Sequence, residues 1–314
     1  MKKKKMILAG GNGYIGHLLA DYFEPKGWEC VVLTRQLTGS PREVLWDGKS
    51  EGDWIQVLEG GEVLINLCGK SVNCRYHQRN RKELINSRLQ PTRLLGKVLG
   101  DLQNPPKIWM NASTATLYKH TYGDAWDESG EIASHPDAKD AFSIDLAQAW
   151  ENGFLGSVPG GIRPVLLRSA MVLGRGRDAN NVLGVLRRLV RWGLGGKMGH
   201  GRQFVSWIHE QDFCRAVEWI LVHPELQGPV NVAAPNPLPN RDMMKILRNR
   251  LNRPLGLPAA AWMLELGAFF LRTETELIIK SRRVISGKLA RSGFCFEFSC
   301  FEDAVMDLNE EIKG

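Results

Sequence analysis

Three glycines near the N-terminus have the spacing of a phosphate-binding turn. Gly10, Gly13 and Gly16 form a G-x-x-G-x-x-G pattern between the apolar residues 6–9 and the amphipathic residues 14–22. In such a turn the first glycine allows the tight bend, the second admits a pyrophosphate, and the third lets the helix pack close to the strand. The N–H groups and dipole at the helix start then face the phosphates. This strand–turn–helix context favours dinucleotide binding over a glycine-rich turn that binds nothing.

The end of the next apolar segment indicates which dinucleotide the turn would hold. Residues 30–34 are followed by Arg35, and no Asp or Glu stands at that end. An acidic residue here bonds the ribose 2′-hydroxyl of NAD, whereas a basic residue accommodates the 2′-phosphate of NADP. We therefore predict NADP(H), with Thr34 and Arg35 beside the ribose and Asn12 at the phosphate edge. The alternative is that Arg35 is only a solvated residue at a strand end.

These residues must be positioned by alternating strands and helices. The apolar patterns predict strands over 6–9, 30–34, 63–67, 107–112 and 164–168, and helices over 14–22, 78–99 and 142–155. Such βαβ alternation predicts an α/β fold, a doubly wound parallel sheet that binds ligands outside the carboxyl ends of its strands.

The alternation stops after Gly174. A glycine-rich loop (193–201), a short strand (204–208), a helix (212–222) and a strand (230–233) follow, and then a proline-rich linker leads into a mainly helical region. We predict a Rossmann domain that binds NADP, formed by residues 1–175 and 212–234. Residues 176–211 and 235–314 are expected to form a smaller, mainly helical cap that binds the substrate.

Composition excludes several classes of protein. The 314 residues are 43% hydrophobic and 24% charged, enough for a substantial core. The net charge of +7 suits an anionic ligand, but the basic residues are scattered and no nucleic-acid-binding motif accompanies them. The six cysteines form no CxxC pair, which indicates reduced thiols in a cytoplasmic protein and neither disulfides nor a metal site.

Two further segments are expected to be neither a membrane span nor a signal peptide. Residues 257–271 are apolar but short and interrupted by Glu265, which favours a buried or interface helix. The lysines at 2–5 precede a strand at once and are expected to be solvated.

The landmarks together resemble the extended or atypical short-chain dehydrogenase/reductases, and within them the epimerase-family proteins with a C-terminal extension. The matching stretches lie at 10–16, 32–35, 46–47, 65–72, 87–95, 166–176, 201–212, 231–240 and 278–296. The WIHEQD segment (207–212) and the APNP segment (234–237) are the most specific of them.

The resemblance implies an NADP(H) site in the first domain and a substrate cleft under the cap. The cofactor positions carried over by motif, together with those of the turn, are Gly10, Asn12, Gly13, Tyr14, Ile15, Gly16, Thr34, Arg35, Asp47, Asn66, Leu67, Cys68, Gly69, Arg88, Asn111, Ala112, Ser113, Arg168 and Met171. Asp47 would lie by the adenine, and residues 168–172 would approach the nicotinamide. Gln203, Trp207 and His209 are the candidates for the substrate cleft.

The catalytic residues typical of the resembled family are only partly present. Most members use a Ser or Thr that binds the substrate oxygen, and a Tyr-x-x-x-Lys pair whose tyrosine is the general acid. Thr114 matches the hydroxyl position, but Ser143 and Ala147 occupy the tyrosine and lysine positions. The one Tyr-x-x-x-Lys in the chain, Tyr22 to Lys26, closes the first helix too far from the phosphates to serve.

Other side chains could replace the missing acid. Tyr118, His120 and Tyr122 follow Thr114, and His209 lies in the WIHEQD segment. We name Thr114 and Tyr118 as the candidate catalytic residues, although packing or a cofactor contact is the simpler role for Tyr118. For His209 a place at the start of a helix, tethering cap to core, is favoured over proton donation.

Two functions stay open at this stage. One is an oxidoreductase or epimerase acting on a small carbonyl or alcohol substrate; the other is an NADP(H)-binding sensor that has lost catalysis. No nucleic-acid or membrane partner is expected. A homodimer is plausible, because relatives pair through the helices that match 78–99 and 142–155.

Overall fold

The computed structural model describes residues 3–133, 141–175, 181–259 and 280–310. Its main sheet and flanking helices comprise β1 (Lys5–Ala9), α1 (Tyr14–Phe23), β2 (Glu29–Thr34), β3 (Glu43–Leu45), β4 (Val63–Asn66), α2 (Gln78–Asp101), β5 (Ile108–Thr114), α3 (Ala141–Leu155), β6 (Arg163–Ser169), α5 (Glu210–Val222) and β10 (Gly228–Val232). Short 3-10 helices lie at Glu24–Lys26, Asp53–Val57 and Ala115–Leu117.

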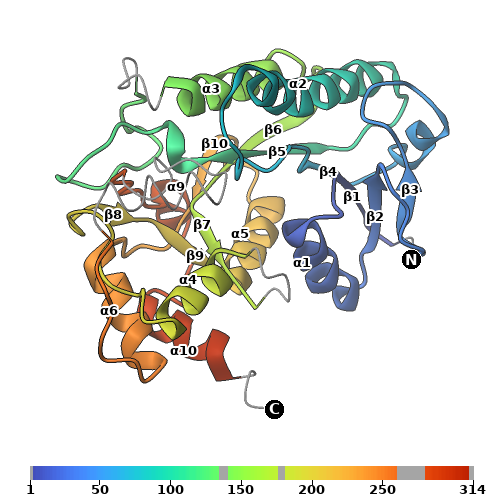
Figure 1. The fold of residues 1–314 in the computed structure, drawn as a ribbon. Helices are drawn as coiled ribbons and strands as arrows, with labels where there is room; N and C mark the ends of the chain where they lie inside the picture. The colour runs from blue at the N-terminus through green and yellow to red at the C-terminus, as the bar shows by residue number, and fades with distance from the viewer. Residues whose placement is uncertain (1–2, 134–140, 176–180, 260–279, 311–314) are drawn as a thin grey trace.

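The seven strands are parallel, in the order β10-β6-β5-β4-β1-β2-β3 (Figure 1). The order reverses between β1 and β4, and the crevice at such a switch point is where doubly wound sheets bind ligands. Both faces are covered: α2 and α3 lie on one, and α1 and α5 on the other (Figure 1). The predicted doubly wound α/β fold is confirmed.

Strand β1 shows why a strand in the middle of this sheet is apolar on both faces. Met6 and Leu8 belong to the core that includes side chains of α1 and α5, while Ile7 and Ala9 belong to the core beneath α2 and α3. All four side chains are fully buried. Successive side chains point to opposite faces, so a strand covered on both sides needs a continuous apolar run.

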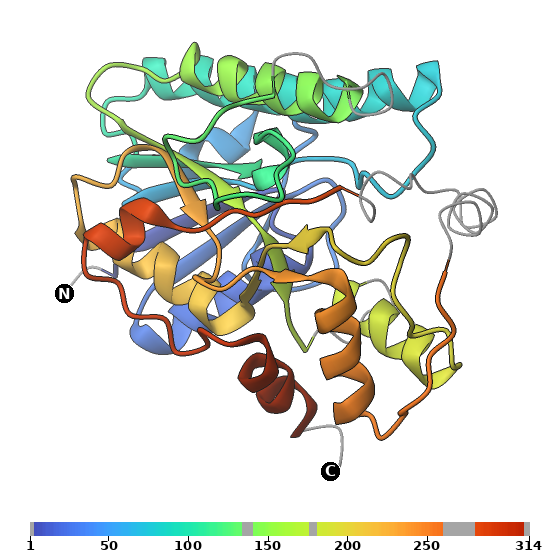
Figure 2. The same cartoon turned by 90° about the vertical axis from the view of Figure 1, so that its left-hand side faces the viewer.

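The second region packs around its own core. It comprises β7 (Met171–Leu173), α4 (Val182–Arg191), β8 (Phe204–Val205), β9 (Trp207–His209), β11 (Leu238–Pro239), α6 (Asn240–Arg250) and α10 (Phe301–Glu310). Strand β7 pairs with β9, and β8 with β11. Figure 2 shows α4, α6 and α10 gathered below the sheet. The predicted single strand over 204–208 is wrong, because Val205 and Trp207 pair with strands of two different sheets.

The C-terminal residues contribute to both regions. Leu289 in α9 (Gly287–Arg291) and Phe294 belong to the core of the main sheet, beside α5. Phe301 and Val305 belong to the core of the second region. The domain boundaries inferred from the sequence stay a prediction. Most of the apolar stretch 257–271 lies outside the described residues, and no described helix is long and apolar enough to cross a membrane.

Candidate cofactor and catalytic site

The glycine turn leaves an open approach to the start of α1. Gly10 has φ +72°, and a Cβ there would lie 2.8 Å from the Cys68 sulfur. A Cβ on Gly13 would meet no atom within 4 Å. Gly13 is the N-cap of α1, which has neither a side-chain cap nor an acidic residue in its first turn. The turn therefore offers helix N–H groups to an anion.

Gly16 packs the helix against the turn and not against the strand as the motif suggested. A Cβ on Gly16 would lie 2.0 Å from the carbonyl oxygen of Gly11. The residue that approaches the strand is Gly11, whose Cβ would lie 2.7 Å from that of Leu8. The sequence analysis overlooked Gly11, although four glycines among seven residues were a signal for it.

Two polar groups beside the turn have no partner in the described structure. Asn12 donates a hydrogen bond from Nδ2 to the Gln36 carbonyl at 3.1 Å, but its buried Oδ1 accepts none. A ribose hydroxyl could supply the missing donor. Arg35 is exposed and makes no hydrogen bond or ion pair with any described residue. The Thr34 hydroxyl bonds only the backbone of Gln36 among the described residues.

Buried amides join β4 to β5 at the carboxyl edge of the sheet. Asn66 donates to the Asn111 side chain at 2.7 Å and to Thr92 at 2.9 Å, and it accepts the Cys68 N–H at 3.1 Å. Burial raises the pKa of the Cys68 thiol to about 12, so this thiol is protonated at neutral pH. Of these residues, Cys68 lies against Gly10 of the glycine turn.

Arg88 is a buried arginine that braces the loop after β4. Its guanidinium donates to the carbonyls of Leu84 and Lys70, both at 3.1 Å, and lies 5.0 Å from the Trp150 ring centroid. Burial lowers its pKa to about 10. A Cβ on Gly69 would lie 3.1 Å from the Arg88 Cζ, so this glycine lets the arginine approach. A direct cofactor contact by Arg88 stays a prediction.

A buried network fastens α3 to the sheet. Arg168 donates to Glu151 at 2.8 and 2.7 Å and to the Tyr118 hydroxyl at 3.0 Å. Ser113 donates to the same carboxylate at 2.5 Å. Burial opposes the charge of Arg168, but the bonds and charge of Glu151 raise its pKa overall. The side chain predicted to approach the nicotinamide is thus committed to Glu151, a partner that the sequence analysis missed.

The hydroxyl of Tyr118 is also committed. It donates to Asn231 Oδ1 at 2.8 Å while it accepts from Arg168. Burial raises its pKa, although Arg168 and the hydrogen bonds act in the opposite direction. A raised pKa and two occupied hydrogen bonds make this hydroxyl a poor proton donor.

Thr114 lies at the end of β5, where its predicted role would place it, and the positions matched to the tyrosine and lysine are Ser143 and Ala147 on α3. Thr114 is half-buried, donates to Thr116 Oγ1 at 2.9 Å and accepts the Thr116 N–H. Ser143 is half-buried on α3 and Ala147 is buried. An alanine has no group to lower a neighbour's pKa or to donate a hydrogen bond.

The Tyr-x-x-x-Lys sequence at Tyr22 and Lys26 forms contacts between helices. Tyr22 donates to Glu218 at 2.6 Å, and Lys26 pairs with the same carboxylate at 2.5 Å. These bonds join the end of α1 to α5, in keeping with the predicted structural role.

The three candidates for the substrate cleft are fully buried. Gln203 donates to the Met198 carbonyl at 2.9 Å, and Trp207 donates to the Asn236 carbonyl at 3.1 Å. His209 caps α5 through the Gln211 N–H and bonds Asp307, which matches the favoured role at a helix start. A substrate contact by any of them stays a prediction.

The remaining predicted cofactor residues lie in different elements: Ile15 in α1, Ala112 in β5, Met171 in β7, and Asp47 and Leu67 just after β3 and β4. Among them Asp47 is exposed, and its Oδ1 accepts the N–H groups of Lys49 and Ser50 at 2.8 Å each, which lowers its pKa. Ile15, Leu67, Ala112 and Met171 are partly buried.

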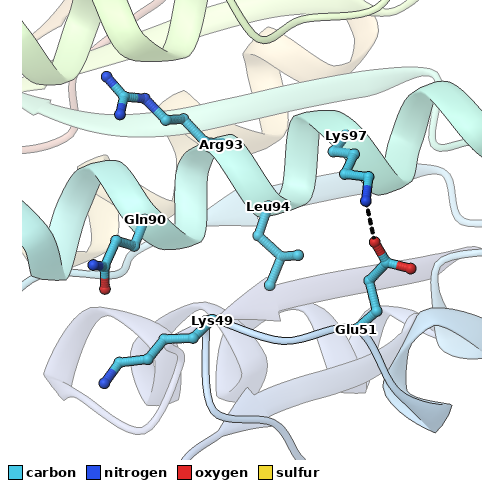
Figure 3. Close-up of a pocket in the computed structure, with 6 residues that line it drawn as sticks. All are labelled: Lys49, Glu51, Gln90, Arg93, Leu94 and Lys97. Atoms are coloured by element: carbon cyan, nitrogen blue, oxygen red, sulfur yellow. Dashed lines mark hydrogen bonds and ion pairs between the residues drawn. The ribbon is translucent and has the colours of Figure 1, made fainter.

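A shallow hollow of about 560 Å³ lies between the loop after β3 and α2 (Figure 3). It is lined by Lys49, Glu51, Gln90, Arg93, Leu94 and Lys97. Lys97 pairs with Glu51 at 2.7 Å, Leu94 points toward the loop, and Arg93 points away from it (Figure 3). Because the cations do not converge, the hollow has no focused anion site. No group of metal-binding side chains occurs in the described part of the chain.

The parallel sheet, the open glycine turn and the helical C-terminal region define a Rossmann-fold protein of the extended short-chain dehydrogenase/reductase type. Residues 6–233 match the NAD dependent epimerase/dehydratase family, and the chain belongs to that family. Residues 259–308 match a domain of unknown function, DUF1731.

Relatives match almost the whole chain. The human epimerase family protein SDR39U1 is 28% identical over 298 residues, which cover 94% of this chain and 96% of the human protein. The protein ML0860 of Mycobacterium leprae is 29% identical over 307 residues, covering 97% and 95%. Both are called epimerase family proteins.

Solved structures agree with this assignment. The crystal structure of human SDR39U1 (isoform 2) with NADPH superposes with a TM-score of 0.85 at 26% identity, covering 98% of this chain and 99% of the human one. The UDP-N-acetylglucosamine 4-epimerase from Bacillus cereus has a TM-score of 0.75 at 19% identity, covering 99% and 97%, which shows a shared fold alone.

Proposed function

We propose that this protein binds NADP(H) in the crevice between β1 and β4. The observation that carries the proposal is the unengaged Arg35 at the end of β2, beside a turn that is open at Gly13. Arg35 would hold the 2′-phosphate, and the N-terminus of α1 would hold the pyrophosphate. The unpaired Oδ1 of Asn12 supports a hydroxyl-bearing ligand beside the turn. The crystal structure of human SDR39U1 with NADPH supports NADP(H) as that ligand.

The chemistry we propose is oxidation or reduction of a small alcohol or carbonyl compound, with epimerisation as its variant. The bound cofactor would accept or supply hydride. Thr114 would donate a hydrogen bond to the substrate oxygen after giving up its bond to Thr116. Since Tyr118 is a poor donor, water or another side chain would supply the proton. Loss of a general acid typically costs about 10²- to 10⁴-fold in rate, so slow turnover is expected.

A second candidate is an NADP(H)-binding sensor without turnover. The observation that favours it is the pair Ser143 and Ala147 on α3, where the resembled enzymes carry their acid and its lysine. The two candidates differ in turnover and not in cofactor binding.

We extend the proposal to the surroundings of the site. The second region would serve as the substrate cap, and the protein would act in the cytoplasm with reduced thiols. A homodimer through α2 and α3 belongs to the same proposal, and light scattering of the purified protein tests it.

Calorimetric titration with NADPH and NADH tests cofactor binding. Wild type should bind NADPH more tightly than NADH, and Arg35→Ala should weaken NADPH binding to about the NADH level. Lys245→Ala is the matched control, because it removes an exposed positive charge from α6. Absence of binding to either dinucleotide would overturn the proposal.

Turnover tests the chemistry. A panel of carbonyl substrates is followed through NADPH absorbance with wild type and Thr114→Ala. Lower turnover in Thr114→Ala supports the oxygen-binding role, and unchanged turnover removes it. Binding without turnover across the panel would favour the sensor.

A further inference from the structure

The glycine turn is joined by side chains to the far end of the chain. Tyr14, the first residue of α1, donates its hydroxyl proton to Glu210 Oε2. The same oxygen accepts the backbone N–H of Arg175 at 3.0 Å. Gly174 makes this junction possible, because a Cβ there would overlap both the Tyr14 hydroxyl and the Glu210 carboxylate. Glu210 therefore links the dinucleotide turn to the start of α5.

The junction continues from Arg175 to α10. The Arg175 guanidinium pairs with Asp307 Oδ2 at 2.6 Å and lies 3.6 Å from Glu210 Oε1. The same Asp307 oxygen lies 3.1 Å from His209 Nε2. Because His209 Nδ1 accepts the Gln211 N–H, the proton of the neutral ring is on Nε2 and is donated to Asp307. Asp307 is thus held by a cation and by a buried ring.

The segment preceding α10 is held by the same part of the molecule. Asp212 is fully buried and accepts the backbone N–H groups of Glu297 and Phe298 at 3.0 and 2.8 Å. The Phe298 ring stacks on His209 with a centroid separation of 3.8 Å. Gln211 adds a hydrogen bond to Glu297 at 2.6 Å, and Trp207 makes an edge contact with Phe301. The WIHEQD segment, residues 207–212, therefore contacts the C-terminal stretch with four side chains while Glu210 holds Tyr14.

We propose that the C-terminal stretch, residues 297–308, is a positioning element for the dinucleotide turn. Its docking on residues 207–212 and the binding of the dinucleotide at Gly13 each strengthen the other. The inference rests on the proposed function, namely that the turn binds NADP(H). It gives a role to part of the region that matches a domain of unknown function.

The physical basis is pre-organisation. Tyr14 begins the helix whose first N–H groups would meet the pyrophosphate, so fixing Tyr14 fixes those donors before the ligand arrives. A site ordered in advance loses less conformational entropy on binding. Coupling between two binding equilibria is reciprocal, so the ligand must also favour docking of α10.

Calorimetry with an isosteric pair of variants tests the coupling. Asp307→Asn weakens the pairing with Arg175 and keeps the side-chain shape. Asp303→Asn makes the same charge change on the exposed face of α10 and is the matched control. We expect Asp307→Asn to weaken NADPH binding by about 5-fold, the lower end of typical coupling, and Asp303→Asn to leave it unchanged. Equal affinities of the two variants would overturn the inference.

Hydrogen exchange gives the reciprocal readout. NADPH should slow backbone exchange across residues 301–309 of wild type, although these residues are remote in sequence from the turn. In the ligand-free protein, Tyr14→Phe should speed exchange there, which tests the junction independently of the cofactor and of any misfolding of Asp307→Asn. Unaltered exchange in both experiments would refute the coupling.

The failures are distinguishable. If wild type binds NADPH but the Asp307→Asn affinity and the exchange at α10 do not respond, the coupling is wrong and the proposed function stands. If wild type binds no dinucleotide, the proposed function fails and the coupling to a ligand fails with it.

Discussion

Glu151 on α3 and Arg168 on β6 form a buried, bidentate ion pair, with N–O distances of 2.8 and 2.7 Å. Each residue is 7% exposed. Glu151 lies four residues, about one helical turn, beyond Ala147, the position that the sequence analysis matched to the lysine of the resembled enzymes. Glu151 is thus the side chain that docks this helix to the sheet.

Removing one partner of this pair should strongly destabilise the fold. Glu151→Ala leaves Arg168 buried without a counter-charge. Removing one partner of a buried ion pair lowers the free energy of unfolding by about 3–5 kcal/mol. Urea unfolding followed by circular dichroism measures the change. Glu51→Ala breaks the exposed pair with Lys97 and should leave the unfolding midpoint unchanged within error. Equal midpoints for the two variants would contradict this interpretation of the network.

Alanine at two glycines of the turn should separate folding from binding. Gly16→Ala places a Cβ against the Gly11 carbonyl, and overpacking of this kind costs about 1–3 kcal/mol. Gly13→Ala meets no neighbour and has a negative φ of −90°, so stability should be retained. Its methyl group would stand where the pyrophosphate approaches, so NADPH binding should be lost. Thermal unfolding measures the stability of both variants, and calorimetry measures their NADPH affinity. Tight NADPH binding by Gly13→Ala would count against placing the pyrophosphate at Gly13.

The Tyr118 hydroxyl should matter more for stability than for proton transfer. Tyr118→Phe leaves the buried Asn231 Oδ1 without that donor, and an unsatisfied buried group costs about 1–3 kcal/mol. NADPH affinity should be unchanged. Once a substrate is found, turnover should fall far less than the roughly 100-fold expected for a general acid. A loss of turnover at full stability would restore Tyr118 as a catalytic candidate.

Stability should decrease on mild acidification because of His209. Burial lowers its pKa, and the opposing effects of Asp307, Glu210 and Asp212 do not compensate. The unfolded chain therefore takes up a proton near the usual value of about 6.5 before the folded protein does. The stabilisation is complete above that value and is lost progressively as pH falls toward the lowered pKa.

The non-titrating variant His209→Asn checks this pH dependence, since asparagine can still cap α5. Urea unfolding between pH 5 and 8 should show a smaller pH dependence for this variant than for wild type. His17→Asn, at an exposed position, controls for loss of a histidine. If the free energy of unfolding changes with pH equally in wild type and His209→Asn, His209 is not the source of the pH dependence.

The sheet could be predicted from the sequence because its signals are local. Strands buried on both faces appear as continuous apolar runs, and the predicted bounds at 6–9 and 30–34 fall within one residue of β1 and β2. The spacing of the glycine turn is equally local, although the atom that a Cβ on Gly10 would meet belongs to Cys68, which is distant in sequence.

The partners of buried charges could not be predicted in this way. Arg168 and Glu151 lie 17 residues apart, and His209 and Asp307 lie 98 apart, so no helical or strand period relates them. One signal was present for Glu151: it shares the buried face of α3 with Ala147 and Phe154, and a carboxylate on such a face needs a cationic partner. Nothing comparable in the sequence indicated that residues 204–205 and 207–209 pair with strands of two different sheets.

The placement of Leu289 and Phe294 bears on the order of events during synthesis. Both complete the core that Met6 and Leu8 of β1 begin. As the chain leaves the ribosome, the parallel sheet therefore emerges with part of its apolar surface uncovered, and that surface stays uncovered until residues 289 and 294 have been synthesised. Molecules released before residue 289 would present that surface to chaperones and proteases.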